Sequence, residues 1–236
     1  MGTSIRYAVP VKDLLLQAFP ATMTLVAAAM VFSILLTFPL GYAAARFKNT
    51  FVDVLIRGFS ILGTATPPFY FAILCILVFG FHLGWFPITG RGDPPDLHHL
   101  ILPAFILGYS DAGHSVRVFR ASLVDSLQED YVRAARARGI GGLSVLFKHS
   151  GRNALIPTTT VLGLSLASIA GSLILVETVF SWPGVGRLVE IGILWNDFPL
   201  VTGALLVLLA YTVIVSAIVD ILYVVIDPRI RTHSGA

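Results

Sequence analysis

The chain has 236 residues, of which 56% are hydrophobic and only 12% are charged. This composition is typical of an integral membrane protein and excludes a water-soluble globular domain. The formal net charge of +3 comes from basic residues that stand between long neutral segments, a placement that indicates membrane topology rather than nucleic-acid binding. The single cysteine, Cys75, excludes a disulfide framework and a cysteine metal cluster.

Long uncharged intervals predict four membrane-spanning helices, because about 20 apolar residues are enough to cross a bilayer. A fifth span is expected over residues 100–123, although this segment contains several ionisable side chains. Without it, the loops that flank the neighbouring spans would have to lie on one side of the membrane. The expected spans, in chain order, are residues 18–45, 58–82, 100–123, 153–178 and 198–224.

The distribution of lysine and arginine predicts the orientation of these spans. Residues 45–57, residues 117–152 and the tail DPRIR (residues 227–231) would share one side, and Lys plus Arg outnumber Asp plus Glu by seven to three in residues 117–152 alone. The positive-inside rule places such segments in the cytosol. We therefore expect an all-α, five-helix transmembrane bundle in the cell inner membrane. It would form one domain over residues 1–236, with the N-terminus outside and the C-terminus cytosolic.

Asp111 is an ionisable residue inside the third expected span, where a charge is costly and therefore marks a candidate functional site. On a helix it shares a face with His114 and Ser115, at i+3 and i+4. This polar strip is a candidate border of a translocation pathway. The alternative is that Asp111 pairs with His114 or with a donor on a neighbouring helix and only fixes packing. Arg117 and Arg120 are expected to extend to the cytosolic headgroups.

The cytosolic loop over residues 124–152 contains the charged stretch EDYVRAARARGIGG. The Ser126-Leu-Gln-Glu129 sequence has the form of a capping box and predicts a helix that starts there. Gly139 supplies the usual left-handed stop. Two interpretations remain open from spacing alone: a solvated loop that only obeys the positive-inside rule, or a short helix that docks on a cytosolic partner.

Enzymatic functions are not supported by the sequence. The glycine clusters GIGGLS and GVGRL lack the lysine of a phosphate-binding loop, so the chain is not expected to hydrolyse ATP itself. His98 and His99 lie near Asp96, but the group lacks a third well-spaced ligand, and no metal site is predicted. No catalytic residue is assigned.

Several stretches taken together resemble one family. EDYVRAARARG followed by HSGRNALIP resembles the cytoplasmic "EAA" loop of ABC-importer permeases, in the form found in the dipeptide, oligopeptide and nickel uptake family. PATMTL, LGWFPITGRG, VETVFSWPGVGRL and DPRIR are similar to further landmarks of that family, and the resemblance covers roughly residues 8 to 231. The chain departs from the general signature in two places: Arg133 stands where the signature has glutamate, and its Leu-Pro is displaced to Leu155-Ile-Pro157.

The resemblance implies that the loop forms a coupling helix that seats in a groove of an ATPase subunit. The implied partners are a second permease subunit, two cytosolic ATP-binding subunits, an extracytoplasmic substrate-binding protein and membrane lipid. No cofactor is expected in this chain, since the partner subunits would hydrolyse the ATP. The residues implied in ATPase coupling are Glu129, Tyr131, Arg133, Ala134, Ala135, Arg136, Gly139 and Ile140.

The resemblance also implies a role for Glu177, which ends the fourth uncharged interval just before SWPG. This region would meet the binding protein or form the outer gate, whereas the alternative is an interfacial cap. Members of the subfamily generally open with an additional span that is missing here, so we expect either a start codon assigned too far downstream or a naturally shorter protein. The function implied is that of half of the translocation pathway of an ATP-driven importer for di- or oligopeptides or a similar small solute. The competing hypothesis is an ATP-independent channel or secondary carrier.

Overall fold

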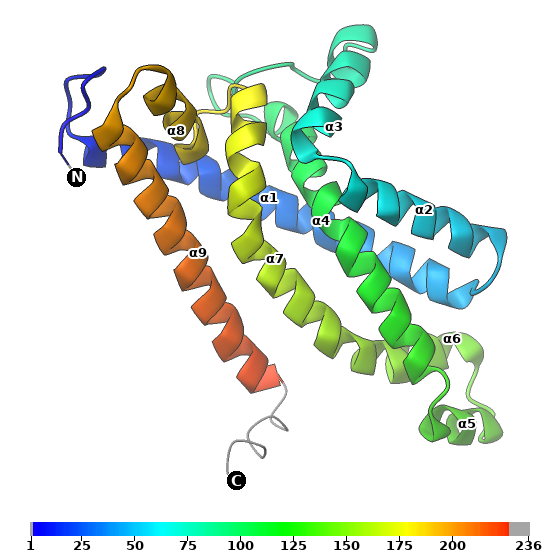
Figure 1. Cartoon of the computed structure of the whole chain (residues 1–236). Helices are drawn as coiled ribbons and strands as arrows, with labels where there is room; N and C mark the ends of the chain where they lie inside the picture. The colour runs from blue at the N-terminus through cyan, green and yellow to red at the C-terminus, as the bar shows by residue number, and fades with distance from the viewer. Residues whose placement is uncertain (1, 227–236) are drawn as a thin grey trace.

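The computed structural model describes residues 2–226 and the side chains as far as residue 221, so the tail DPRIR lies outside the described residues. The elements are α1 (Val11–Arg46), α2 (Phe51–Ala65), α3 (Pro68–Cys75), the π-helical segment η1 (Ile76–His82), α4 (Leu97–Ser126), α5 (Asp130–Ala137), α6 (Gly142–Ser144), the π-helical segment η2 (Val145–Ser150), α7 (Gly151–Val179), α8 (Val185–Leu194) and α9 (Phe198–Ile226). The start of the chain and α8 lie at one end, and α5 and α6 lie at the other (Figure 1). We call these the α8 end and the α5 end.

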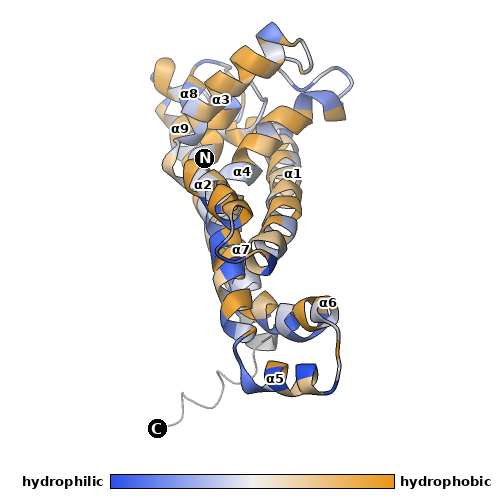
Figure 2. Ribbon diagram, turned by 90° about the vertical axis from the view of Figure 1, so that its right-hand side faces the viewer, coloured by the Kyte–Doolittle hydropathy of each residue, from blue (hydrophilic) through white to orange (hydrophobic). Residues whose placement is uncertain are grey.

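Three helical stretches within the described residues are long and apolar enough to cross a membrane. They are α1, the continuous run Gly142–Val179 that ends in α7, and the part of α9 over Phe198–Ile221. The expected spans 18–45 and 153–178 lie inside the first two, and the span 198–224 lies inside α9. Hydrophobic residues dominate these long helices, whereas hydrophilic residues gather on α5 (Figure 2).

The segment expected to form the span 58–82 is not one helix. It consists of α2 followed by α3 and η1, whose directions differ by 108°. The bend has a local cause, because Thr66 is held in the extended conformation that a residue before proline prefers. Pro68 then begins α3, at a position where a backbone N–H would have no partner within the helix, so the lack of this group breaks no helical hydrogen bond. The two parts together are apolar enough to count as one broken span or as a re-entrant segment.

α4 covers the whole of the expected span 100–123 and lies at the centre of the bundle, against α1, α2 and α7. Two glycines allow its close approach to its neighbours. A side chain at Gly108 would collide with the backbone of α1 at Ala29, and one at Gly113 would collide with the backbone of α2 at Ser60. Small residues at helix contacts are the usual way in which membrane helices approach each other.

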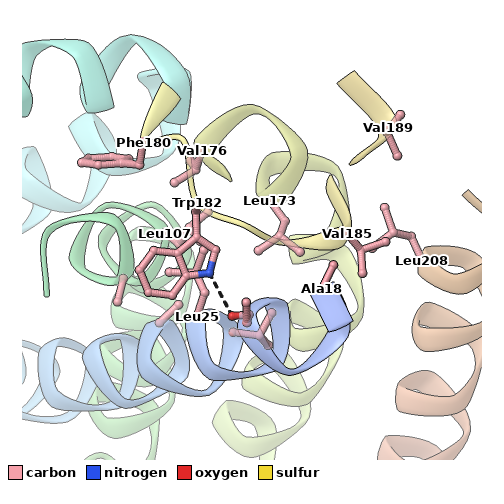
Figure 3. Close-up of a cluster of buried hydrophobic side chains, with 14 of the residues drawn as sticks. Ala18, Leu25, Leu107, Leu173, Val176, Phe180, Trp182, Val185, Val189 and Leu208 are labelled. Atoms are coloured by element: carbon pink, nitrogen blue, oxygen red, sulfur yellow. Dashed lines mark hydrogen bonds between the residues drawn. The ribbon is translucent and has the colours of Figure 1, made fainter. Parts of the chain in front are cut away.

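The hydrophobic core of the α8 end surrounds Trp182, which is only 1% exposed. Its indole points from the turn after α7 toward α1, and Nε1 donates a hydrogen bond to the carbonyl of Ala21 at 3.0 Å (Figure 3). Leu25, Leu107 and Leu173 come from three different helices and belong to the same buried cluster. This packing fixes the turn between α7 and α8 on the start of α1.

Candidate functional site

The short helix α5 begins at Asp130, so the predicted start at a capping box is wrong. Ser126 is the last residue of α4, and Glu129 precedes α5 without a side-chain cap. The hydroxyl of Ser126 instead hydrogen-bonds with that of Tyr131. The physical reason is tertiary packing: Leu123 is fully buried in a cluster that includes residues of α1 and α7, and α4 continues as far as Ser126, which is therefore not free to cap a new helix. α5 ends as expected, with Gly139 at a φ of 78°.

The two faces of α5 differ. Val132 and Ala135 are 0% and 1% exposed and pack against Val145 of η2. The opposite face is exposed, and the side chains of Asp130 and Arg133 retain 95% and 76% of their accessible surface. The residues expected in ATPase coupling therefore divide into an exposed group and a group turned toward this chain. The exposed group comprises Glu129, Arg133, Ala134, Arg136 and Gly139, whereas Ala135 is buried and Ile140 is partly buried.

Tyr131 connects α5 to α7. The amide Nδ2 of Asn153, near the start of α7, donates a hydrogen bond to Tyr131 Oη at 2.9 Å. The bond between Tyr131 and Ser126 joins the same side chain to the end of α4. One hydroxyl thus links α5 to both α4 and α7.

A polar cavity of about 270 Å³ lies between α4 and α7. Asp111 lines it, and its Oδ2 accepts a hydrogen bond from Ser33 Oγ of α1 at 2.5 Å. Three helices thus converge on this carboxylate. The lining residues are Leu107, Ser110, Asp111 and His114 of α4, with Ser165, Ser168, Ile169 and Ser172 of α7.

The structure separates the three residues of the expected polar strip. Asp111 and His114 line the cavity, whereas Ser115 is fully buried away from it, and its Oγ has no hydrogen-bond partner among the described residues. The serines of α7 were missed in the sequence analysis. The sequence does contain a pattern that indicates them, because serines 165, 168 and 172 are spaced so that they share one face of a helix.

Glu177 lies in the interior near the α8 end and is 0% exposed. Its Oε1 accepts a hydrogen bond from Thr22 Oγ1 at 2.8 Å, and its Oε2 accepts one from the backbone N–H of Arg187 at 3.1 Å. The carboxylate occupies the space that a side chain at Gly184 or Gly186 would need. In this structure Glu177 therefore holds the turn between α7 and α8 on α1, and it is not accessible to a solute.

The expectation for Arg120 is wrong. Its guanidinium makes a bidentate contact with the buried carboxylate of Asp53, with both N–O distances 2.6 Å, instead of extending to headgroups. Arg57 lies 3.5 Å from the same carboxylate. A buried carboxylate requires such pairing, which here joins α2 to α4. Arg117 is exposed and donates to the carbonyl of Gly113 within its own helix.

Among the described residues, no group of three or more His, Cys, Asp or Glu side chains is placed to hold a metal ion. The two loop histidines point to different partners. His99 Nδ1 lies 2.7 Å from Asp96 Oδ1, while His98 Nε2 lies 2.6 Å from the carbonyl of Trp85. Asp96 also caps α4 by accepting the N–H of His99, which is a structural role.

Comparison with known proteins agrees with this architecture. An oligopeptide transport system permease of Bacillus subtilis (strain 168) is 37% identical over 239 residues, covering 98% of this chain and 75% of that relative. A probable D,D-dipeptide transport system permease of Escherichia coli (strain K12) is 39% identical over 262 residues, covering 100% of this chain and 77% of that relative. A glutathione transport system permease of Escherichia coli O6:H1 is 36% identical, covering 98% of this chain and 74% of that relative.

Solved structures show the same fold at low sequence identity. A chain of the inward-facing MetNI methionine ABC transporter superposes with a TM-score of 0.74 at 14% identity, covering 91% of this chain and 96% of that one. A chain of an amino acid ABC transporter gives a TM-score of 0.71 at 13% identity, covering 94% and 99%. The fold is that of a type I ABC importer permease.

The family comparison covers most of the chain. Residues 37–232 match the family described as the binding-protein-dependent transport system inner membrane component. This description names a transport component rather than an enzyme, places the chain in the inner membrane and implies ATP-binding partners and a binding protein. The chain therefore belongs to the family of ABC-importer permeases, the inner membrane components of binding-protein-dependent transport systems.

Proposed function

We propose that this permease forms half of a translocation pathway for di- or oligopeptides, or for a similar small solute. A second permease subunit, two ATP-binding subunits and an extracytoplasmic binding protein complete the importer. The names of the relatives support the cargo, because they describe an oligopeptide, a D,D-dipeptide and a glutathione transport system. The α5 end faces the cytosol and the start of the chain lies outside, as the positive-inside rule requires.

The observation that carries this proposal is the division of α5 into two faces. The buried face, with Val132 and Ala135, holds the helix on the membrane domain. The exposed face, with Arg133 and Ala134, is free to dock in an ATP-binding subunit. Glu129, Arg136 and Gly139 extend this exposed surface. Tyr131 is also exposed but directs its hydroxyl to Ser126 and Asn153, and Ile140 is partly buried.

The mechanism follows from the connections of α5. ATP-driven movement of the partner displaces α5, and the hydrogen bonds of Tyr131 transfer the displacement to α4 and α7. These are the two helices that line the polar cavity around Asp111. Rigid-body movement of two such bundles against each other would open the pathway to each side in turn. His114 belongs to this pathway. Ser115 and Glu177 act on it only through helix packing.

The complete importer in proteoliposomes tests the proposal. We expect uptake of a labelled dipeptide that requires ATP, the binding protein and both permeases. The matched control replaces the phosphate-binding lysine of the ATP-binding partner, which leaves the assembly intact and removes hydrolysis. Equal uptake by this control, or by the present chain alone without ATP, would instead establish a channel or secondary carrier.

A further inference from the structure

Two carboxylates on the central helices of this bundle have opposite surroundings. Asp53 is neutralised by the bidentate contact with Arg120 and by Arg57. Asp111 faces the cavity between α4 and α7, and within the described residues no ion pair joins it to a lysine or arginine. Its Oδ2 accepts a hydrogen bond from the neutral hydroxyl of Ser33 on α1. The chain thus supplies a counter-ion for one carboxylate and leaves the other facing an open space.

The rest of the lining is rich in oxygen. Ser165, Ser168 and Ser172 lie opposite Asp111 and His114, and neither lysine nor arginine lines the cavity. Hydroxyl and carboxylate oxygens accept hydrogen bonds, so this lining suits a group with several donors and a positive charge. His114 and Ser168 are exposed, and the cavity therefore opens at the surface of the chain.

The size of the cavity restricts what it accommodates. A volume of about 270 Å³ lies just below the range of roughly 300–1,000 Å³ that is usual for pockets of drug-sized ligands. It is suited to the end of a small peptide rather than to a whole oligopeptide. A divalent metal ion is a poorer match, because Asp111 and His114 supply only two of the ligands that such an ion needs.

From this geometry we infer that Asp111 and the serines of α7 form a subsite for a primary ammonium group, the amino terminus of the transported peptide. The inference rests on the proposed peptide cargo. The carboxylate neutralises the ammonium charge inside the membrane domain, and the hydroxyls accept its remaining N–H groups. A cargo without a charged amino terminus has no ammonium group for Asp111 to neutralise.

The test compares dialanine with N-acetyl-dialanine in proteoliposomes that contain the complete importer and ATP. Asp111→Asn preserves the shape of the side chain and removes its charge. We expect it to lower dialanine uptake roughly tenfold to a hundredfold, the range for loss of one charge-assisted hydrogen bond. Uptake of N-acetyl-dialanine should stay within about twofold of wild type, because this peptide has no ammonium group and loses no charge-assisted hydrogen bond in the variant. The same binding protein is used throughout. Its preference for one peptide over the other therefore cancels when the uptake of each peptide by the variant is divided by its uptake by wild type.

Ser168→Lys provides a second variant that does not depend on the folding of Asp111→Asn. Ser168 is exposed and lines the cavity, so a lysine at this position fits without a steric collision and places its own ammonium in the cavity. Dialanine uptake should fall while N-acetyl-dialanine uptake is retained. Ser122→Ala, which alters a partly buried serine of α4 outside the lining, should change neither.

Each contrary result has a distinct meaning. If wild type imports dialanine but both substitutions affect the two peptides equally, the ammonium subsite is refuted while the importer stands. If wild type imports neither peptide with ATP, the proposed cargo itself fails. Binding of Ni²⁺ to the wild-type chain that is lost in Asp111→Asn would assign the cavity to a metal and overturn the inference.

Discussion

At the scale of single residues, two carboxylates at the α8 end bind parts of this chain rather than cargo. Asp197 is 0% exposed and accepts hydrogen bonds from the Ser4 hydroxyl and from the backbone N–H groups of Arg6 and Leu200, the latter two at 3.2 Å. Glu177 likewise accepts a hydrogen bond from the backbone N–H of Arg187, just after the turn that follows α7. Although burial raises the pKa of Asp197, these hydrogen bonds outweigh it and hold the pKa below its usual range.

The lowered pKa of Asp197 predicts a pH-dependent contribution to stability. A carboxyl whose pKa is depressed in the folded state stabilises fully above its unfolded pKa, about 3.9, and the contribution is lost as the pH falls through the folded pKa. We expect Asp197→Asn to destabilise the protein by about 1–3 kcal/mol at pH 7, with the difference from wild type shrinking below about pH 4. Thermal unfolding in detergent across this pH range measures it.

Asp13 supplies the control for this experiment. It is an exposed carboxylate in the first turn of α1, and Asp13→Asn should change the free energy of unfolding by no more than about 0.5 kcal/mol. A constant difference between Asp197→Asn and wild type from pH 7 to pH 3 would contradict the role given to the ionised carboxylate.

At the scale of elements, α5 is held by packing on one side and exposed on the other. Its eight residues are too few to form a stable isolated helix in water. The contacts of Val132 and Ala135 with Val145 therefore position it. Adjacent alanines consequently have different roles: Ala134 is exposed and Ala135 is buried.

This difference predicts distinct effects for the same substitution at the two alanines. Ala134→Glu should lower co-purification with the ATP-binding partner and ATP-driven uptake by about tenfold or more, because a charge enters a docked surface. The unfolding temperature of the separate permease should stay unchanged. Ala135→Glu should lower the unfolding temperature as well, since it buries an unpaired charge. If Ala134→Glu retains the ATP-binding partner, α5 does not dock through its exposed face.

At the scale of the whole molecule, α5 and the polar cavity lie far apart along α7 but share it as a common element. Asn153 contacts Tyr131 near the start of α7, and Ser165 to Ser172 line the cavity farther along the same helix. α4 makes the corresponding connection from Ser126 back to Asp111. The Arg120–Asp53 ion pair attaches the broken segment that begins with α2 to this same central helix.

Tyr131→Phe should therefore uncouple ATP hydrolysis from transport. The substitution removes only the hydroxyl that bonds Ser126 and Asn153, at a cost to stability of about 1–2 kcal/mol. We expect the ATP-binding partner to co-purify normally, while the amount of peptide imported per ATP hydrolysed falls severalfold. Tyr70→Phe, at an exposed tyrosine of α3, is the matched control. An unchanged ratio of transport to hydrolysis in Tyr131→Phe would show that the hydroxyl does not transmit movement.

The sequence alone determined the fold class, the inner-membrane location and the presence of a short helix that ends at Gly139. These features depend on local properties, namely the length of apolar intervals and the backbone freedom of one glycine. The motifs around EDYVRAARARG were sufficient to recognise the family. The prolines at 67 and 68 were visible, but how far they bend the chain was not.

Only the tertiary structure decided which faces meet. Packing around Leu123 accompanies the continuation of α4 to Ser126, the first residue of the predicted capping box. Packing of α5 on η2 buries Ala135 and leaves Ala134 exposed. Asp111 meets Ser33 and the serines of α7 only because α1, α4 and α7 converge. Glu177 is buried against Thr22 of α1, a contact that spacing along the sequence does not predict. Each outcome depends on contacts between residues distant in the chain, and a one-dimensional pattern of hydropathy and spacing does not encode which helix supplies the neighbour.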